Sequence, residues 1–219
     1  MKIAVVVPAY NENKRISKVL EKLVDTNLPI IVVDDGSKDQ TFNTVKGFKV
    51  IALRHKVNLG KGAALKTGAQ AAFSLGAQAV VIMDSDGQHK VEELPKFIQL
   101  INSGKYDIVI GTRNLSHGVP LIRYLGNKFA SLFIRFLFNI YVSDLLCGYR
   151  AFTKQAFNKM NWQSSGYGVE TEMIAKIGIY NLKYCEVPVE TVYYDKFKGV
   201  TILDATNILG NVIKWRLFK

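Results

Sequence analysis

The chain has 219 residues, of which 48% are hydrophobic, and this length and composition predict one domain with a sizeable core and room for a small appendage. Two cysteines, Cys147 and Cys185, fit a reducing compartment better than a disulfide framework. The longest uncharged run, residues 67–83, contains two glycines and two glutamines, unlike a membrane span. The formal net charge of +11 at pH 7 indicates an anionic partner, without choosing among nucleic acid, anionic lipid and phosphorylated ligands.

Strand and helix patterns alternate through the first half of the chain. Apolar runs that end at turn residues predict buried strands over residues 2–8, 29–34, 49–53, 79–83 and 107–111. Apolar residues three and four apart predict the intervening helices, one of which should open at Ser37, since Ser37 and Gln40 resemble a capping box. Strands that alternate with helices predict a parallel sheet with right-handed crossovers.

The second half of the chain has a different character. No acidic residue occurs between residues 112 and 142, and the patterns predict a helix over 127–141, a strand over 148–153, a helix over 167–179, a strand over 184–194 and a closing helix over 201–219. The first and last of these helices have narrow polar stripes, which suit either a buried core helix or a helix on a membrane surface. We expect residues 1–199 to form the main domain and residues 200–219 an amphipathic helix that contacts a membrane or a membrane-protein partner.

Two carboxylates directly follow the fourth predicted strand. Asp84 and Asp86 are separated by one residue, so on an extended chain both side chains lie on one face and can reach one cation. A hard divalent ion prefers such oxygen ligands and keeps coordination positions for substrate phosphates. The alternative is a solvated strand end with an Asx turn at Asp86-Gly87. Open α/β sheets bind ligands at the carboxyl ends of their strands, which is where this pair lies, but the Asp-x-Asp pattern alone does not decide between the cation site and the turn.

Polar clusters follow four of the predicted strands. In chain order they are Pro8-Ala-Tyr-Asn-Glu12, Asp34-Asp-Gly-Ser37, Asp84-Ser-Asp-Gly-Gln-His89 and Gly111-Thr-Arg113. Their joint occurrence resembles the family 2 inverting glycosyltransferases of the GT-A fold. The last two clusters and Cys147-Gly-Tyr-Arg150 further resemble the dolichyl-phosphate mannose and glucose synthases. The resemblance covers about residues 1–195.

This resemblance implies a fold and an activity. The fold would be α/β, the GT-A nucleotide-diphosphosugar transferase fold, with a mostly parallel central sheet flanked by helices. The activity would be metal-dependent transfer of a hexose from a GDP-mannose- or UDP-glucose-type donor to dolichyl or polyprenyl phosphate. We expect the protein to lie at the cytoplasmic face of a membrane as a peripheral enzyme.

The resemblance also assigns a donor site. Tyr10 would stack on the nucleobase, Glu12 would accept hydrogen bonds from ribose hydroxyls, and Asp34 would accept one from a base N–H. Asp35 is interpreted as a turn-capping residue, and Lys61 either reaches a phosphate or the base or is a solvated lysine. The full predicted donor site is Pro8, Ala9, Tyr10, Glu12, Asp34, Lys61, Asp84, Ser85, Asp86, Gln88 and Arg113.

The predicted metal site consists of Asp84, Asp86 and Gln88, which would hold Mg²⁺ or Mn²⁺ against the donor diphosphate. We interpret His89 as a satisfied polar residue rather than a ligand. Together with Asp86, the predicted catalytic residues are Arg113 and Arg123, whose guanidinium groups would hold the diphosphate and the acceptor phosphate. The alternative for both arginines is a solubilising surface role. Asn127 stands where the resembling enzymes often have serine.

An acceptor phosphate has a second pKa of roughly 6, so it reaches the site as an anion and needs no general base. Glu170 and Glu172 are therefore interpreted as structural or substrate-orienting, and Asp144 with Arg150 as an internal ion pair. A rival enzyme would transfer sugar to a hydroxyl of a glycan or small molecule with Glu170 or Glu172 as base. A rival of another class is a nonenzymatic membrane-associated scaffold or nucleic-acid binder; the carboxylate site and the long apolar faces argue against it, and we expect no nucleic acid partner.

Overall fold

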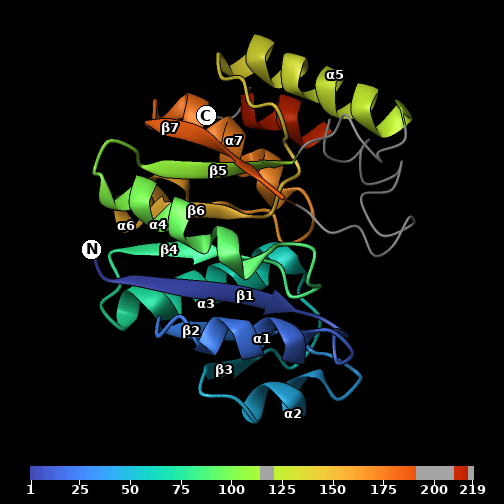
Figure 1. Ribbon diagram of the computed structural model, residues 1–219. Coiled ribbons are helices and arrows are strands. Elements are labelled where there is room, and N and C mark those ends of the chain that lie inside the picture. The colour runs from blue at the N-terminus through green and yellow to red at the C-terminus, as the bar shows by residue number, and fades with distance from the viewer. Residues whose placement is uncertain (114–120, 191–209, 217–219) are drawn as a thin grey trace.

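The computed structural model describes residues 1–113, 121–190 and 210–216. In these residues seven strands form one sheet in the order β3-β2-β1-β4-β6-β5-β7 (Figure 1). All neighbours pair in parallel except β6, which runs antiparallel to β4 and β5. The strands are β1 (Ile3–Ala9), β2 (Ile30–Asp34), β3 (Ile51–Arg54), β4 (Ala79–Ile82), β5 (Ile108–Arg113), β6 (Arg150–Thr153) and β7 (Tyr184–Val189). The predicted mostly parallel sheet flanked by helices is confirmed.

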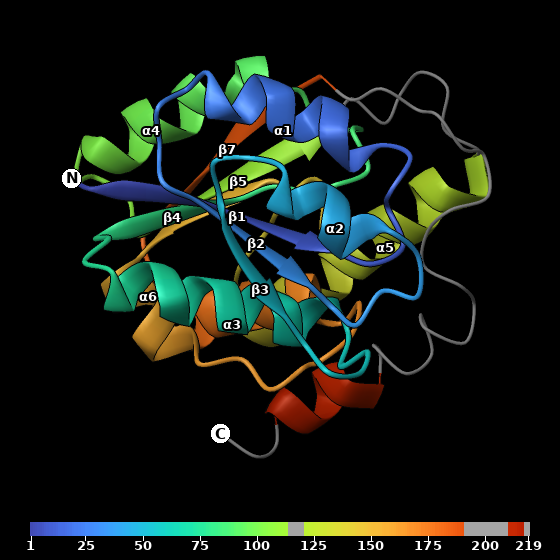
Figure 2. The same ribbon diagram turned by 90° about the horizontal axis from the view of Figure 1, so that it is seen from below.

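Helices cover both faces of the sheet (Figure 2). Strand β1 lies between β2 and β4 and is buried along its whole length. Its alternate residues face opposite sides: Val5 and Val7 pack with α1, α2 and α4, whereas Val6 packs with α3, α6 and α7. The helices are α1 (Ile16–Val24), α2 (Thr41–Lys46), α3 (Lys61–Ser74), α4 (Leu94–Asn102), α5 (Leu121–Phe138), α6 (Lys154–Met160) and α7 (Val169–Ile179), with a 3₁₀ turn at Val91–Glu93.

Helix α3 approaches the sheet closely because Gly68 has no side chain. A Cβ at this position would lie 2.4 Å from Cγ1 of Val6, well inside van der Waals contact. The glycine therefore lets the backbone of α3 pack directly against the Val6 side chain of β1. This close packing sets the first residue of the helix, Lys61, at the edge of the sheet where the parallel strands end.

The expected capping box at Ser37 is wrong. Helix α2 begins at Thr41, and the Ser37 hydroxyl instead accepts a hydrogen bond from the backbone N–H of Asn11 at 2.9 Å. At the start of α2 the hydrogen-bond acceptor is Asp39, whose carboxylate accepts a hydrogen bond from the backbone N–H of Thr41 at 2.9 Å. Ser37 therefore links β1 to β2 and does not begin a helix.

Helix α5 lies at the β7 end of the sheet and contacts α7 (Figure 1). It begins at Leu121 and ends at Phe138, earlier at both ends than the pattern over 127–141 predicts. Residues 210–216 are also helical, within the predicted closing helix, and the predicted boundary at residue 199 lies outside the described residues. Among the residues described, none of the helices has the length and hydropathy needed to span a bilayer.

Candidate active site

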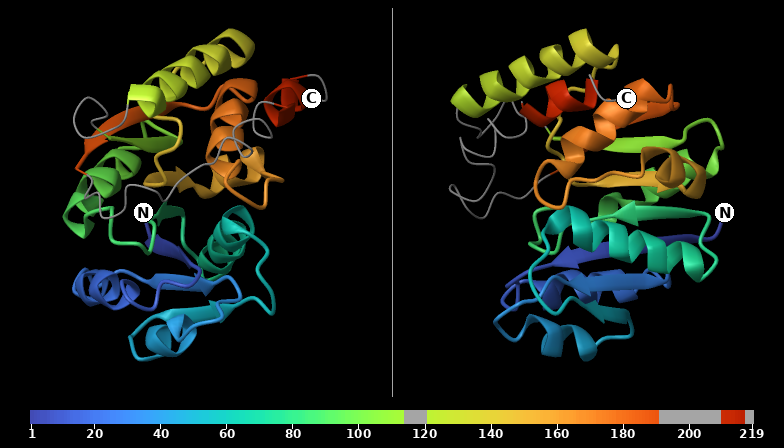
Figure 3. Two further views of the ribbon diagram at one scale, coloured as in Figure 1. Left: turned by 90° about the vertical axis from the view of Figure 1, so that its right-hand side faces the viewer. Right: turned by 180° about the vertical axis from the view of Figure 1, so that it is seen from behind.

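The strands β1, β2, β4 and β5 run in the same direction and end at one edge of the sheet, which faces the viewer in Figure 3 (left). The four polar clusters, which lie at the ends of these strands, therefore gather at this edge. Ala9 and Asp34 are register partners at the ends of β1 and β2, and Asp84 follows two residues after β4. The predicted positions Pro8, Ala9 and Ser85 are at these strand ends, and Ala9 and Ser85 are buried. The sheet thus brings the sequence clusters together as predicted.

Lys61 joins two acidic residues at the centre of this edge. Its Nζ lies 2.8 Å from Oδ1 of Asp84 and 2.7 Å from Oε1 of Glu170. Burial alone would lower the pKa of Lys61, but the two carboxylates outweigh burial and raise that pKa above its usual range. Lys61 is therefore a charged residue fixed within the site, and the solvated alternative is wrong.

Asp84 and Asp86 differ in their electrostatic surroundings. Burial opposes ionisation of Asp84, but the positive charge of Lys61 holds its pKa below the usual range. Burial and the negative charge of Asp84 raise the pKa of Asp86, and Glu12 adds to the repulsion. The Asx turn considered as the alternative is present, since Oδ1 of Asp86 accepts the backbone N–H of Gln88 at 3.0 Å.

The chemistry of these residues fits a divalent cation. A cation would relieve the repulsion that raises the pKa of Asp86, and both carboxylates are hard oxygen ligands. His89 is not a satisfied polar residue: its buried Nδ1 lacks a hydrogen-bond partner in the described ranges and lies 4.0 Å from Oδ2 of Asp84. No three His, Cys, Asp or Glu side chains of those ranges already converge as a metal site. Substrate phosphate oxygens and water would therefore complete the coordination, with Gln88 beside them.

The Cys147–Arg150 turn packs directly on Asp84. Because β6 is antiparallel and pairs Arg150 with Ile82, the turn before β6 lies beside the residues after β4. A Cβ on Gly148 would lie 2.5 Å from Oδ2 of Asp84 and 3.0 Å from Nζ of Lys61. Only a glycine therefore lets this turn and the Asp84–Lys61 pair occupy their observed positions.

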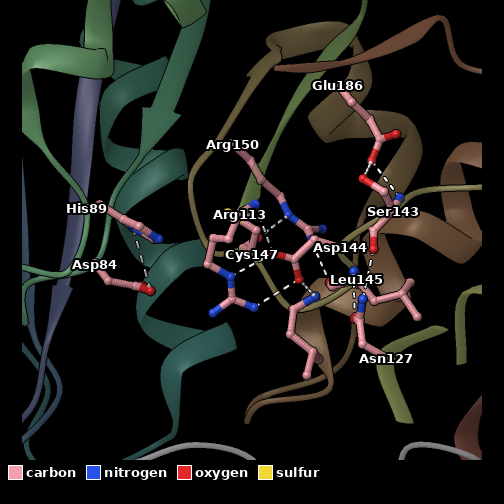
Figure 4. A network of polar contacts seen from close by, with 11 residues as sticks. Asp84, His89, Arg113, Asn127, Ser143, Asp144, Leu145, Cys147, Arg150 and Glu186 are labelled. Atoms are coloured by element: carbon pink, nitrogen blue, oxygen red, sulfur yellow. Dashed lines mark hydrogen bonds and ion pairs between the residues drawn. The ribbon is translucent and has the colours of Figure 1, made fainter. Parts of the chain in front are cut away.

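The predicted ion pair between Asp144 and Arg150 is wrong. Arg150 is buried and donates to three backbone carbonyls, those of Leu145 at 2.7 Å, Glu170 at 2.8 Å and Cys147 at 2.9 Å. Asp144 pairs instead with Arg113, whose Nε and Nη2 lie 2.6 and 2.9 Å from its two carboxylate oxygens (Figure 4). Arg123 is in α5, but its side chain lies outside the described residues.

A pocket of about 550 Å³ opens beside Tyr10 at the ends of β1, β2 and β3. The Asp34 carboxylate is fully buried: Oδ1 accepts the backbone N–H of Ser37 at 3.3 Å, and Oδ2 lies 3.0 Å from Nε of Arg54. A nucleobase bound in this pocket would therefore contact the Arg54 side chain rather than the buried Asp34 carboxylate. The lining residues are Tyr10, Gly36, Ser37, Lys38, Arg54, His55, Lys56, Val57 and Asn58.

Sequence reasoning missed Arg54, although a signal was present. Arg54 ends β3, beside Asp34 in the parallel register, and its guanidinium lies over the Phe42 ring at 5.0 Å. Its position at a strand end is the feature that identified the other clusters. Glu12 is buried, and its backbone N–H donates to Oγ1 of Thr41 at 2.8 Å.

Asp35 and Glu172 hold backbone around the site. The Asp35 carboxylate accepts the N–H groups of Leu59 at 2.9 Å and Gly60 at 2.7 Å, which fixes the turn that leads into α3. Glu172 accepts those of Gln163 at 2.9 Å and Ser164 at 2.7 Å. Both contact sets agree with the structural interpretation of these residues.

Comparisons with known proteins agree with this geometry. A match to glycosyl transferase family 2 covers residues 4–161. The chain is 33% identical over 245 residues to the UDP-N-acetylglucosamine–dolichyl-phosphate N-acetylglucosaminyltransferase of Methanococcus voltae, covering 99% of this chain and 97% of that protein. It is 28% identical over 235 residues to the undecaprenyl-phosphate mannosyltransferase of Micrococcus luteus, covering 99% and 95%.

A solved structure shows the same fold. The glucosyl-3-phosphoglycerate synthase of Mycobacterium tuberculosis, crystallised in complex with Mn²⁺, uridine diphosphate and glucosyl-3-phosphoglycerate, superposes with a TM-score of 0.76 at 19% identity, covering 100% of this chain and 81% of that chain. The family match spans most of the chain, and the relatives match it along almost their whole length. The chain therefore belongs to glycosyl transferase family 2 and is a glycosyltransferase of the GT-A fold.

Proposed function

We propose that the protein is a metal-dependent, inverting glycosyltransferase that moves a hexose from a nucleotide diphosphate sugar onto dolichyl or polyprenyl phosphate at the cytoplasmic face of a membrane. The names of the two curated relatives, which act on dolichyl and undecaprenyl phosphate, support the acceptor class. The observation that carries the proposal is that the carboxylates of Glu170 and Glu172 both contact other groups of the protein. Glu170 is ion-paired with Lys61, and Glu172 accepts two backbone N–H groups, so neither is arranged as a base for a hydroxyl acceptor.

The donor would lie along the edge of the sheet from β3 to β4. Tyr10 and Arg54 line the pocket for the base, and Asp84, Asp86 and Gln88 follow β4 where the diphosphate would end. A divalent ion held there, Mg²⁺ or Mn²⁺, would neutralise negative charge on the leaving diphosphate. Lys61 holds Asp84 ionised and in place, because its charge lowers the pKa of that carboxylate.

The acceptor would supply its own nucleophile. A phosphate monoester has a second pKa of roughly 6, so its oxygen attacks the anomeric carbon as an anion at neutral pH. Arg113 would hold this phosphate, or the diphosphate opposite it, with Arg123 as its predicted companion. The rival is a family 2 enzyme that transfers sugar to a hydroxyl group. Substitution of its candidate general bases, Glu170 and Glu172, separates the two.

The proposal is tested by a screen of donors and acceptors. GDP-mannose, UDP-glucose and UDP-N-acetylglucosamine are each incubated with a short polyprenyl phosphate or with the matching free polyprenol, with and without Mn²⁺. We expect one donor to give a glycosylated lipid phosphate, only with the metal and only with the phosphate acceptor. Transfer to the free alcohol at a comparable rate would contradict the acceptor assignment, and metal-independent transfer would contradict the cation site.

Glu170→Gln and Glu172→Gln, made singly, are expected to retain measurable transfer to polyprenyl phosphate. Removal of a true general base costs about 10²–10⁴ in rate, and an ionised acceptor has no such requirement. The measurement is the initial rate at saturating donor, with circular dichroism as the check on folding. If either folded variant binds donor normally but loses all transfer, the hydroxyl-acceptor rival is favoured.

The membrane contact that we propose lies on α5. Phe136 is 86% exposed and Phe129 63%, and Leu125 and Leu132 are exposed along the same helix, beside the exposed cations Lys128 and Arg135. Such a surface suits an anionic lipid interface, where a lipid phosphate acceptor would be found.

In the closing helix, part of the apolar side packs against the main domain and is not available to a membrane. Val212 is only 1% exposed and packs in the core, and Trp215 packs against that core, whereas Ile213 is exposed. At least this turn of the helix therefore belongs to the packed domain. Residues 191–209, which include the first part of the predicted closing helix, lie outside the described residues.

Phe129→Ser/Phe136→Ser is expected to weaken sedimentation with anionic liposomes. Burial of a large apolar side chain contributes roughly 1.5–3 kcal/mol, so loss of two such contacts should lower the partition coefficient by at least about a hundredfold. High salt should weaken wild-type binding as well. The matched control is Leu75→Ser, at the far end of α3, where the side chain is 53% exposed. Equal loss in both variants, or no wild-type binding, would contradict the α5 surface.

A further inference from the structure

We infer that Asn127 and Asp144 are positioning residues, which together fix the guanidinium of Arg113 beside Asp84. The inference rests on the proposed role of Arg113 in holding a phosphate. Figure 4 shows the network that carries it: Arg113 lies between the Asp84–His89 pair and Asp144, and Asn127 lies on the other side of Asp144. The charge of Arg113 contributes to the lowered pKa of Asp84, which agrees with this closeness.

The first link is the pair between Asp144 and Arg113. Nε and Nη2 of Arg113 lie 2.6 and 2.9 Å from the two carboxylate oxygens, and the backbone N–H of Arg113 also donates to Asp144 at 3.2 Å. Asp144 is buried, so this fork-to-fork pair fixes the plane of the guanidinium. Because the group is planar, the edge that carries Nη1 points away from Asp144. Asp144 thereby sets the direction in which Arg113 can meet a phosphate.

The second link holds Asp144 itself. Nδ2 of Asn127 donates to the backbone carbonyl of Ser143 at 2.8 Å, and its Oδ1 accepts the backbone N–H of Leu145 at 3.2 Å. The amide therefore spans Asp144 and contacts the residue on either side of it. Glu186, from β7, accepts the N–H and hydroxyl of Ser143 at 2.7 and 2.9 Å. The loop that carries Asp144 is thus fixed from both α5 and β7.

These contacts give Asn127 a role that serine could not fill. The amide supplies a donor and an acceptor on separate atoms, which matches the carbonyl and N–H groups that it spans. A serine has a single oxygen on a shorter side chain and could not reach both. If Asn127 instead bound a phosphate directly, serine would be an adequate replacement. The two roles therefore make opposite predictions for Asn127→Ser.

The test combines a spectroscopic and a kinetic measurement on the full chain. The ¹⁵Nε–¹Hε signal of Arg113, assigned by its loss in Arg113→Lys, reports the pair with Asp144. We expect a shifted, slowly exchanging signal in the wild type and in the control Ser131→Ala, which changes a buried hydroxyl on the same helix. Asn127→Ser, Asn127→Leu and Asp144→Asn should abolish this protection and lower kcat/KM for the acceptor about tenfold, the range seen when supporting residues are removed.

The outcomes separate this inference from the proposed function. An unchanged Arg113 signal in folded Asn127→Ser overturns the inference, as does a fall in kcat/KM that occurs while the signal persists. If the wild type transfers nothing to polyprenyl phosphate, the proposed function fails and the Arg113 signal alone decides the inference. Loss of the signal in the two Asn127 variants, with retention in Ser131→Ala, supports it in either case.

Discussion

Asp86→Asn is expected to lower the rate of sugar transfer on the order of a hundredfold, the scale of loss when one group that stabilises developing charge is removed. Asp86 is the carboxylate whose pKa burial and Asp84 raise, so it is the position that gains most from a bound cation. The amide keeps the size of the side chain and can still accept the N–H of Gln88, so the turn should survive.

A second measurement separates the loss of a metal-coordinating carboxylate from misfolding of the variant. Titration calorimetry with the nucleoside diphosphate should show that Mn²⁺ strengthens nucleotide binding in the wild type and has little effect in Asp86→Asn. Asp25→Asn, at the exposed end of α1, is the control and should match the wild type in both assays. Wild-type activity in a folded Asp86→Asn enzyme would remove this residue from the proposed site.

Gly148→Ala is expected to reduce transfer at least tenfold and to lower stability by about 1–3 kcal/mol, the usual cost of overpacking. The added Cβ would meet Oδ2 of Asp84 at 2.5 Å, so either Asp84 must leave Lys61 or the Cys147–Arg150 turn must shift. The measurements are the transfer rate and the thermal unfolding temperature.

The matched control is Gly126→Ala in α5, where a Cβ would meet no atom within 4 Å. Alanine is the better helix former, so this variant should be neutral or more stable by about 0.4–1 kcal/mol. If Gly148→Ala behaves like Gly126→Ala in both measurements, the contact between the turn and Asp84 does not constrain the site.

The fold was predictable where its signals are local. Apolar runs located β1, β2, β4 and β5 closely, because these strands are largely buried on both faces and are therefore apolar along most of their length. An apolar run also located β3, although that strand is partly exposed at the edge of the sheet. The antiparallel direction of β6 was not predictable, since it depends on which strands Arg150–Thr153 finally lies between. Helix α6 was also missed, because it follows β6 without a turn and is only seven residues long.

The site was predictable as a set of strand ends but not as a set of contacts. Sequence placed Asp84, Asp86 and Arg113 at one edge, which follows from parallel strands alone. It could not show that Asp144 pairs with Arg113 rather than with Arg150, because both arginines lie near Asp144 in the folded chain. The choice depends on three backbone carbonyls that accept hydrogen bonds from Arg150. Nor could it show that Lys61 joins Asp84 to Glu170, residues more than eighty positions apart.

The place of β6 in the sheet has a consequence for how the chain acquires its activity during synthesis. The strands β3, β2, β1 and β4 are neighbours and all precede residue 83, so this half-sheet can assemble on the ribosome. β5 emerges next, but it joins β4 only through β6, which is made about forty residues later. The same late segment delivers Gly148 and then Glu170 to Asp84 and Lys61. A nascent chain therefore exposes the unpaired edge of β4 until β6 arrives, and the Lys61–Glu170 ion pair can form only after α7 has left the exit tunnel.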